Sequence, residues 1–244
     1  MEMSSIVAVV LAGGQGTRIR HLLPEIPKPM APVRGRPFVE WIVRYLVRQG
    51  ITRVIIGTGY KAGVIEEHFA ASPVKDIQVT CVREDEPLGT AGGFLHAVAH
   101  SPFSGEAWLV LNGDSLVFTP LASLAESLRD PAVQGALLGV EMEDTARYGT
   151  LLTGPNGQLR GFREKQPGAG LINSGVYLLR RELTARFSAQ RPLAFETQVF
   201  PALLQADVKL QAVPVRAPFL DIGTPESLQQ AETFIGENEG WLLG

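Results

Sequence analysis

Residues 6–18 read Ile-Val-Ala-Val-Val-Leu-Ala-Gly-Gly-Gln-Gly-Thr-Arg, and this stretch decides the fold. Its first six residues are apolar and rich in β-branched side chains, which is typical of a short strand buried on both faces. Glycines follow at positions 13, 14 and 16, so the chain can turn sharply where the strand ends. A buried strand that runs directly into such a turn indicates an α/β protein with a parallel sheet.

The same alternation of strand and helix continues outward from this stretch. Apolar runs predict further strands at residues 54–57, 77–82 and 107–111, and helical spacing predicts helices at 38–49, 61–71 and 90–100. Strands joined in this way form a parallel sheet covered by helices on both faces, and ligands bind beyond the carboxyl ends of its strands. The first candidates for a functional site are therefore the segments that follow strands, at 12–18, 84–93 and 112–114.

The second half of the chain is more mixed. Strands are expected at 137–140, 150–153, 159–162, 172–179 and 210–215, a hairpin turn at Gly-Pro-Asn-Gly (154–157), and helices at 121–129, 196–205 and 225–236. The expected fold is a Rossmann-like, mixed but mainly parallel central sheet with helices on both faces and a β elaboration beside the ligand site. Because no linker or repeat divides the chain, we expect a single domain over residues 1–244, with halves 1–118 and 119–244.

The composition limits the class of protein. Of the 244 residues 45% are hydrophobic, enough for a full core, and the net charge of −3 offers no basic stripe for nucleic acid. The one cysteine, Cys81, rules out an intramolecular disulfide, and no apolar stretch reaches the roughly 18 residues of a membrane span. A cytoplasmic protein without nucleic-acid or membrane partners is expected. The sequence leaves open whether the apolar residues Trp241, Leu242 and Leu243 pack on the core or in a homodimer.

The glycine-rich turn is suited to binding phosphate. Glycines let the backbone aim successive N–H groups into one concavity, and Arg18 adds a planar cation that pairs with phosphate oxygens. The spacing matches neither the dinucleotide-binding pattern G-x-G-x-x-G nor the P-loop with its Gly-Lys-Ser/Thr ending. Taken alone, the loop could equally be a tight turn that needs glycine for its geometry.

A lysine between two prolines follows the loop, in Ile-Pro-Lys-Pro-Met at 26–30. The prolines fix the backbone on both sides of Lys28, which reduces the entropy lost when a long cationic side chain is held at a target. The alternative is a proline-rich loop with a solvated lysine. The preceding glycine loop favours the functional interpretation.

These two motifs in this order resemble those of the sugar-1-phosphate nucleotidyltransferases, which make nucleotide sugars from a nucleoside triphosphate and a sugar 1-phosphate. The resemblance extends through nearly the whole chain. Its later motifs are Glu-Pro-Leu-Gly-Thr-Ala-Gly at 86–92, Leu-Asn-Gly-Asp at 111–114, Arg-Tyr-Gly-Thr at 147–150, Phe-Arg-Glu-Lys at 162–165, Ile-Asn-Ser-Gly-Val-Tyr at 172–177 and Asp-Ile-Gly-Thr-Pro at 221–225. So many motifs in one order make the match highly specific.

The resemblance implies roles for individual residues. Arg18, Lys28 and Asp114 would be catalytic. Asp114 and Asp221 would hold Mg²⁺, because two carboxylates can share one hard cation with phosphate oxygens and water; without the resemblance, each could instead cap a loop or helix. The first half would bind the nucleotide through Leu11, Ala12, Gly13, Gly14, Gly16, Thr17, Glu84, Glu86, Pro87, Gly89, Thr90, Asn112 and Gly113. The second half would bind the sugar phosphate through Tyr148, Gly149, Glu164, Lys165 and Asn173.

The segment 84–93 lies where such enzymes read the base. Guanine presents two parallel donors, N1–H and the N2 amine, which a carboxylate matches, whereas uracil and thymine present one donor between two acceptors, which an amide fits better. The segment offers Glu84 and Glu86 and no glutamine, so guanine is expected. Which glutamate reads it stays open, as does a contribution from the backbone of residues 87–89.

Within this family the chain looks most like the bacterial D-glycero-α-D-manno-heptose 1-phosphate guanylyltransferases, at residues 26–35, 86–90, 170–173 and 221–223. GTP and heptose 1-phosphate are then the expected substrates, and pyrophosphate is released. Mannose-1-phosphate guanylyltransferases and MurNAc-1-phosphate uridylyltransferases are the alternatives. A protein that only senses a nucleotide sugar would be expected to lack Lys28 or a metal carboxylate, and both are present here.

Overall fold

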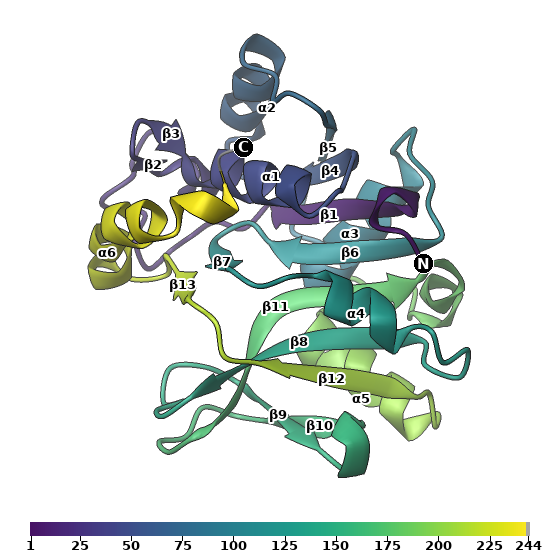
Figure 1. Cartoon of the computed structure of the whole chain (residues 1–244). Helices are drawn as coiled ribbons and strands as arrows, with labels where there is room; N and C mark the ends of the chain where they lie inside the picture. The colour runs from purple at the N-terminus through teal and green to yellow at the C-terminus, as the bar shows by residue number, and fades with distance from the viewer. Residues whose placement is uncertain (243–244) are drawn as a thin grey trace.

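The structure, a computed structural model, describes residues 1–242 and is built on a nine-stranded sheet (Figure 1). The strands follow the order β10-β9-β11-β6-β1-β4-β5, with β8 paired to β11 and β12 paired to β8. Their bounds are β1 Ile6–Ala12, β4 Arg53–Thr58, β5 Gln78–Arg83, β6 Ala107–Asn112, β8 Gly135–Met142, β9 Thr150–Thr153, β10 Leu159–Arg163, β11 Gly170–Arg180 and β12 Leu210–Val215. The mixed α/β sheet expected from the sequence is confirmed.

The parallel part of the sheet comes from the first half of the chain. β1 lies between β4 and β6, parallel to both, with Val9 opposite Ile55 and Val110. Alternate side chains of β1 enter the cores on opposite faces of the sheet. Helices α1 (Phe38–Arg48) and α2 (Ala62–Ala71) contribute to one core and α3 (Thr90–Ala99) to the other, so helices cover both faces (Figure 1).

The second half extends the same sheet with antiparallel strands. β11 pairs antiparallel with β6 and with β8, and β12 runs parallel to β8, so the two halves share one continuous sheet. β9 and β10 form the predicted hairpin, whose turn Pro155–Gly157 carries Asn156 at a φ of 58°. This hairpin is the expected β elaboration, and it lies at the edge farthest from β5 (Figure 1).

Several short elements were not expected from the sequence. β2 (Pro32–Val33) pairs with β3 (Arg36–Pro37), and β7 (Ser115–Val117) pairs antiparallel with β13 (Phe219–Asp221). Strands of two or three residues show no periodicity of their own, so only the pairing defines them. The β7–β13 pair matters for function because it joins the segment after β6 to a segment near the end of the chain.

The helices of the second half differ from expectation in length and type. α4 spans only Ala122–Ser127, and the helix expected at 196–205 begins as a π-helical turn, Phe195–Val199, before α5 (Phe200–Gln205). α6 (Pro225–Glu237) is present as predicted, and Thr224 forms a capping box with Ser227 at its start.

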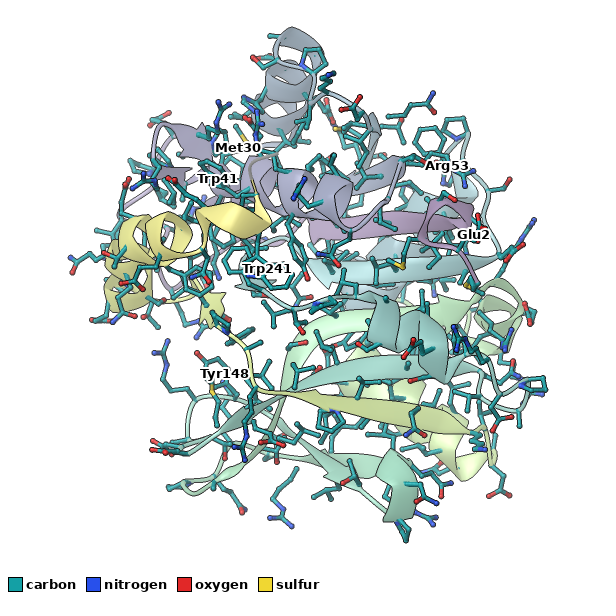
Figure 2. All side chains as sticks on the ribbon, in the orientation of Figure 1. Glu2, Met30, Trp41, Arg53, Tyr148 and Trp241 are labelled. Carbon is teal, nitrogen blue, oxygen red and sulfur yellow. The ribbon has the colours of Figure 1, made fainter. Side chains whose placement is uncertain are left out.

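The last described residues pack against the core. Leu242 is buried and Trp241 is half-buried, and both pack with the core on the α1 face (Figure 2). Trp241 and Leu242 therefore pack on the core of their own chain, and Leu243 lies outside the described residues. Within residues 1–242 no helix is both long and apolar enough to cross a membrane.

Candidate active site

Three adjoining cavities open beyond the carboxyl ends of β1 and β6, where the sheet topology predicts a ligand. We name them by their lining. The loop cavity, about 260 Å³, lies against residues 14–19 and Lys28. The Glu84 cavity, about 490 Å³, lies between the glycine loop and residues 82–96, and the wide cavity, about 1260 Å³, lies against the β9–β10 hairpin. Asp114 lines all three, so the cavities meet at its carboxylate.

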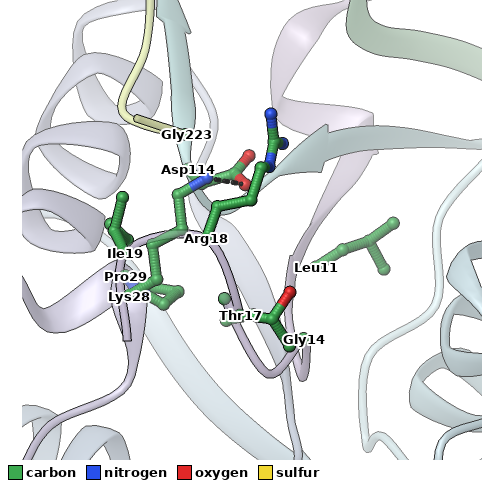
Figure 3. A pocket seen from close by; sticks show the side chains of 11 residues that line it. Leu11, Gly14, Thr17, Arg18, Ile19, Lys28, Pro29, Asp114 and Gly223 are labelled. Atoms are coloured by element: carbon green, nitrogen blue, oxygen red, sulfur yellow. Dashed lines mark hydrogen bonds and ion pairs between the residues drawn. The ribbon is translucent and has the colours of Figure 1, made fainter. Parts of the chain in front are cut away.

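The glycine loop brings the backbone close to Lys28. Gly16 has a φ of +57°, and a Cβ there would lie 2.9 Å from the Cβ of Lys28, so only glycine fits without strain. Thr17, Arg18 and Lys28 all line the loop cavity (Figure 3). The loop therefore combines exposed backbone with two cationic side chains, which is an arrangement suited to phosphate.

Lys28, Asp114 and Asp221 form an ion-pair cluster at the junction of the cavities. The Lys28 ammonium, on a side chain only 8% exposed, lies 2.6 Å from Oδ2 of Asp114 and 3.8 Å from Oδ1 of Asp221 (Figure 3). The two carboxylate oxygens can therefore be no farther apart than these two distances together. Their convergence follows from the β7–β13 pair, which sets Asp221 opposite Ser115, the residue after Asp114.

The electrostatics of the cluster favour a cation. Burial, together with the nearby charge of Asp114, raises the pKa of Asp221 above its ordinary value, although Lys28 and Arg18 act in the opposite direction. Two carboxylates that already converge on one ammonium are a fitting donor set for a divalent cation. Within residues 1–242 no group of three or more acidic, histidine or cysteine side chains gathers to hold a metal. A cation bound here would thus have positions left for water and phosphate oxygens.

The Glu84 carboxylate is held in a slot lined by glycines. A Cβ on Gly13 would lie 2.6 Å from its Oε1, and one on Gly93 would lie 3.0 Å from its Oε2. Burial raises the pKa of Glu84, against a hydrogen bond from the backbone of Leu88. His96 lines the same cavity and donates from Nε2 to the carbonyl of Arg83, 2.9 Å away. The slot thus presents a half-buried acceptor to the cavity.

The wide cavity gathers the residues expected to bind a sugar phosphate. Tyr148, Gly149, Glu164, Lys165 and Asn173 all line it, together with Asp114 and Asp221. Tyr148 (labelled in Figure 2) packs edge-on against Phe219 of β13, the strand that also carries Asp221, and Arg147 lies over the Tyr148 ring.

Most of the residues expected to bind the nucleotide line the first two cavities. These are Leu11, Ala12, Gly13, Gly14, Gly16, Thr17, Glu84, Pro87, Gly89, Thr90 and Asn112. Glu86 is exposed and is absent from the lining of all three cavities. Gly113 is absent as well, and its glycine is explained by packing, since a Cβ would lie 2.7 Å from the Leu11 carbonyl oxygen.

Sequence reasoning missed several lining residues. Thr58 and His96 reach the Glu84 cavity from β4 and α3, and Arg147, Arg160 and Glu196 reach the wide cavity. Arg147 stands inside a motif quoted above, so its neighbour Tyr148 could have pointed to it. Glu196 stands next to the apolar Phe195, and nothing in its spacing marks it.

Comparisons with known proteins agree with this geometry. The family model described as "Nucleotidyl transferase" matches residues 7–238. A D-glycero-alpha-D-manno-heptose 1-phosphate guanylyltransferase of Campylobacter jejuni is 37% identical over 90% of this chain and 95% of its own length. A mannose-1-phosphate guanylyltransferase of Mycobacterium tuberculosis is 34% identical over 93% of this chain, but this chain spans only 63% of that relative's length.

Solved structures show the same fold. The crystal structure of HddC from Yersinia pseudotuberculosis complexed with GMP-PN superimposes with a TM-score of 0.81 at 32% identity, covering 93% of this chain and 98% of that one. The family match spans nearly all of the chain, and a relative above 30% identity is covered almost end to end. This chain therefore belongs to the nucleotidyl transferase family.

Proposed function

We propose that this protein is a sugar-1-phosphate guanylyltransferase, which forms a GDP-sugar and pyrophosphate from GTP and a sugar 1-phosphate. The observation that carries the proposal is the Lys28–Asp114–Asp221 cluster, because it stands where the three cavities meet. Transfer of a nucleotidyl group needs a base site, a phosphate site and an acceptor site that open on one reacting centre. The three cavities supply that arrangement.

Glu84 is proposed to read the guanine. Its carboxylate only accepts hydrogen bonds, and guanine presents N1–H and N2–H side by side as two parallel donors. Of the two glutamates considered, Glu84 lines the cavity and Glu86 does not. A uracil base would leave one of its acceptors facing a carboxylate oxygen, which argues against the uridylyltransferase alternative.

The triphosphate is proposed to lie against the glycine loop, with Arg18 and Lys28 as its cationic partners. The α-phosphate would then lie near Lys28, which lines the loop cavity and contacts Asp114, the residue that lines all three cavities. Asp114 and Asp221 are proposed to hold Mg²⁺, which would supply positive charge that offsets the charge of the phosphates.

The reaction is proposed to be a direct displacement. A phosphate oxygen of the sugar 1-phosphate, oriented by Lys165, attacks the α-phosphorus; the new P–O bond forms as the bond to the β-phosphate oxygen breaks and pyrophosphate leaves. The displacement needs no covalent intermediate on the protein, so positioning and charge neutralisation supply the rate enhancement. Lys28 stabilises the α-phosphoryl oxygens and Arg18 stabilises the departing pyrophosphate.

The proposed acceptor is D-glycero-α-D-manno-heptose 1-phosphate. Relatives with that name, from Campylobacter jejuni and Aneurinibacillus thermoaerophilus, are 37% and 34% identical and match over 95% and 96% of their own length. Mannose 1-phosphate is the second candidate, supported by the 34% identical relative from Mycobacterium tuberculosis. A cytoplasmic location, where GTP is made, is part of the same proposal.

One assay tests the whole proposal. Pyrophosphate release is measured with GTP, ATP, UTP and dTTP, each against a panel of heptose and hexose 1-phosphates. We expect GTP with heptose 1-phosphate to give the highest kcat/KM. A faster reaction with UTP or dTTP would overturn the guanine assignment, and a preference for mannose 1-phosphate would replace the heptose.

A further inference from the structure

A chain of three side chains crosses the floor of the wide cavity. Asn173 donates from Nδ2 to the hydroxyl of Tyr177, 2.8 Å away, and that hydroxyl donates to Oε1 of Glu196, 2.9 Å away. Asn173 and Glu196 line the cavity, whereas Tyr177 is fully buried beneath them.

The direction of each hydrogen bond in this chain is fixed by chemistry. Burial and the charge of Glu196 raise the pKa of Tyr177 far above its ordinary value, so its hydroxyl keeps its proton. The Glu196 carboxylate can only accept, so Tyr177 must donate to it and must accept from the Asn173 amide. The Asn173 carbonyl oxygen in turn accepts from the backbone N–H of Gly175 at 3.2 Å, which fixes the orientation of the amide.

The backbone around these residues is built to hold them. β11 changes register between Asn173 and Tyr177, and Gly175 in between has a φ of +75°. Glu196 lies in the π-helical turn Phe195–Val199, a feature found frequently at functional sites. The Tyr177 ring is fixed by Phe195 and Phe200 at centroid distances of 5.4 and 4.9 Å, so its hydroxyl has little freedom to move.

Two polar groups of this chain remain for a ligand. Among residues 1–242, Oε2 of Glu196 has no hydrogen-bond partner, and Glu196 forms no ion pair within 4.0 Å. The second N–H of the Asn173 amide is the other. A fixed acceptor and a fixed donor, joined through one tyrosine, match two hydroxyl groups of a sugar, one of which donates while the other accepts.

We propose that Glu196 is a specificity-determining residue, whose free carboxylate oxygen accepts a hydrogen bond from one sugar hydroxyl while Asn173 donates to another. Tyr177 is the positioning residue that sets both groups. The proposal rests on the function proposed above, because it takes the wide cavity as the sugar-phosphate site. It adds that sugar selection depends on an acidic acceptor contributed by the π-helical turn.

The test uses the full chain with GTP and the sugar 1-phosphate that the wild-type protein uses best. We expect Glu196→Gln to raise the KM for the sugar 1-phosphate about 10-fold or more, because hydrogen bonds to charged groups contribute that much, with the KM for GTP unchanged. Glu126→Gln, on an exposed glutamate of α4, is the matched control and leaves both constants unchanged.

Monodeoxy analogues of the same sugar 1-phosphate identify the contact. For the wild type, removal of the hydroxyl that faces Glu196 costs about 10-fold in kcat/KM; for Glu196→Ala the same removal costs nothing further, while removal of other hydroxyls costs as much as before. Tyr177→Phe is expected to weaken the same discrimination partly. If Glu196→Ala fails to fold, Glu196→Gln, which keeps the shape, is used with the same analogues.

The outcomes separate this inference from the proposed function. A wild-type protein that releases no pyrophosphate from GTP with any sugar 1-phosphate contradicts the proposed function and this inference with it. Two results with an active wild type contradict this inference alone. In the first, the Glu196 variants keep the wild-type KM for the sugar 1-phosphate. In the second, they become equally insensitive to the removal of every sugar hydroxyl.

Discussion

The ammonium of Lys28 lies 2.6 Å from the carboxylate of Asp114, a residue 86 positions further along the chain. The pair is held from both sides: the turn at 28–30 fixes the lysine, and the end of β6 fixes the aspartate. With Asp221 at 3.8 Å, a single cation satisfies two acidic groups at the point where the cavities join.

Removal of this lysine tests its part in the chemistry. We expect Lys28→Ala to lower kcat by on the order of 10³-fold, because a cation lost from the transferring phosphate of related reactions has effects of that size. Steady-state pyrophosphate release measures it. Lys75→Ala, on a side chain that is 91% exposed, is the control and stays at the wild-type rate. Near wild-type turnover of Lys28→Ala would remove the lysine from the mechanism.

Divalent cations are expected to be required. EDTA should abolish pyrophosphate release and added Mg²⁺ should restore it, because the triphosphate and the carboxylates of Asp114 and Asp221 are all negative and a divalent cation offsets their repulsion. Asp221→Asn should raise the Mg²⁺ concentration needed for half-maximal activity by about 10-fold or more, as seen when ligands or their partners are changed in metal sites. Full activity of the wild type in EDTA would contradict the metal assignment.

The proposed role of Glu84 in binding guanine predicts a pH dependence. The raised pKa of Glu84 means that its carboxylate takes up a proton at a pH above the ordinary value for glutamate. We therefore expect kcat/KM for GTP to fall as the pH falls through that raised pKa, since a protonated carboxyl cannot accept from both guanine donors. Glu84→Gln should lack this acidic limb and should use GTP less well at neutral pH. Identical pH profiles for the two proteins would sink the assignment.

Glu40 predicts a separate pH effect on stability. Burial raises the pKa of Glu40, but hydrogen bonds from Arg44, Arg36 and His68 outweigh it, and the net pKa is lowered. The stabilisation is therefore present above the unfolded value, about 4.5, and is lost as the pH falls through the lowered pKa.

Urea unfolding of Glu40→Gln measures this contribution. At pH 7 we expect the free energy of unfolding to drop by about 2 kcal/mol, because the side chain is only 4% exposed and its partners are charged. The difference from wild type should shrink as the pH falls below the unfolded value of about 4.5 and through the lowered pKa. Glu67→Gln, on an exposed glutamate of α2, serves as the control. An equal loss of stability at every pH would contradict the account.

The sequence predicted best what depends on continuous local patterns. The strands β1, β4, β5 and β6 and the three helices between them were located to within about two residues, because each carries its own apolar period. The glycine loop and Lys28 were found for the same reason, since their motif is contiguous.

The parts that were missed depend on pairing over long distances. β7 and β13 are three residues each, and neither would form without the other. The sequence alone could not distinguish Glu84 from Glu86, because the slot that holds the Glu84 carboxylate is formed by Gly13 and Gly93 in the folded chain. It could not single out Glu196, because the hydrogen bond that orients this carboxylate comes from the hydroxyl of Tyr177. Such relationships leave no periodic trace in either segment.

The pairing of β7 with β13 also determines when the site can form while the chain is being synthesised. Asp221 lies far after Asp114 in the sequence and is therefore synthesised later, and only β13 brings its carboxylate to the acidic pair. A nascent chain can thus complete the parallel strands β1, β4, β5 and β6 while it still lacks the second carboxylate. The acidic pair therefore forms only after β13 has been synthesised, and a chain that stops short of β13 would contain the glycine loop without the second carboxylate.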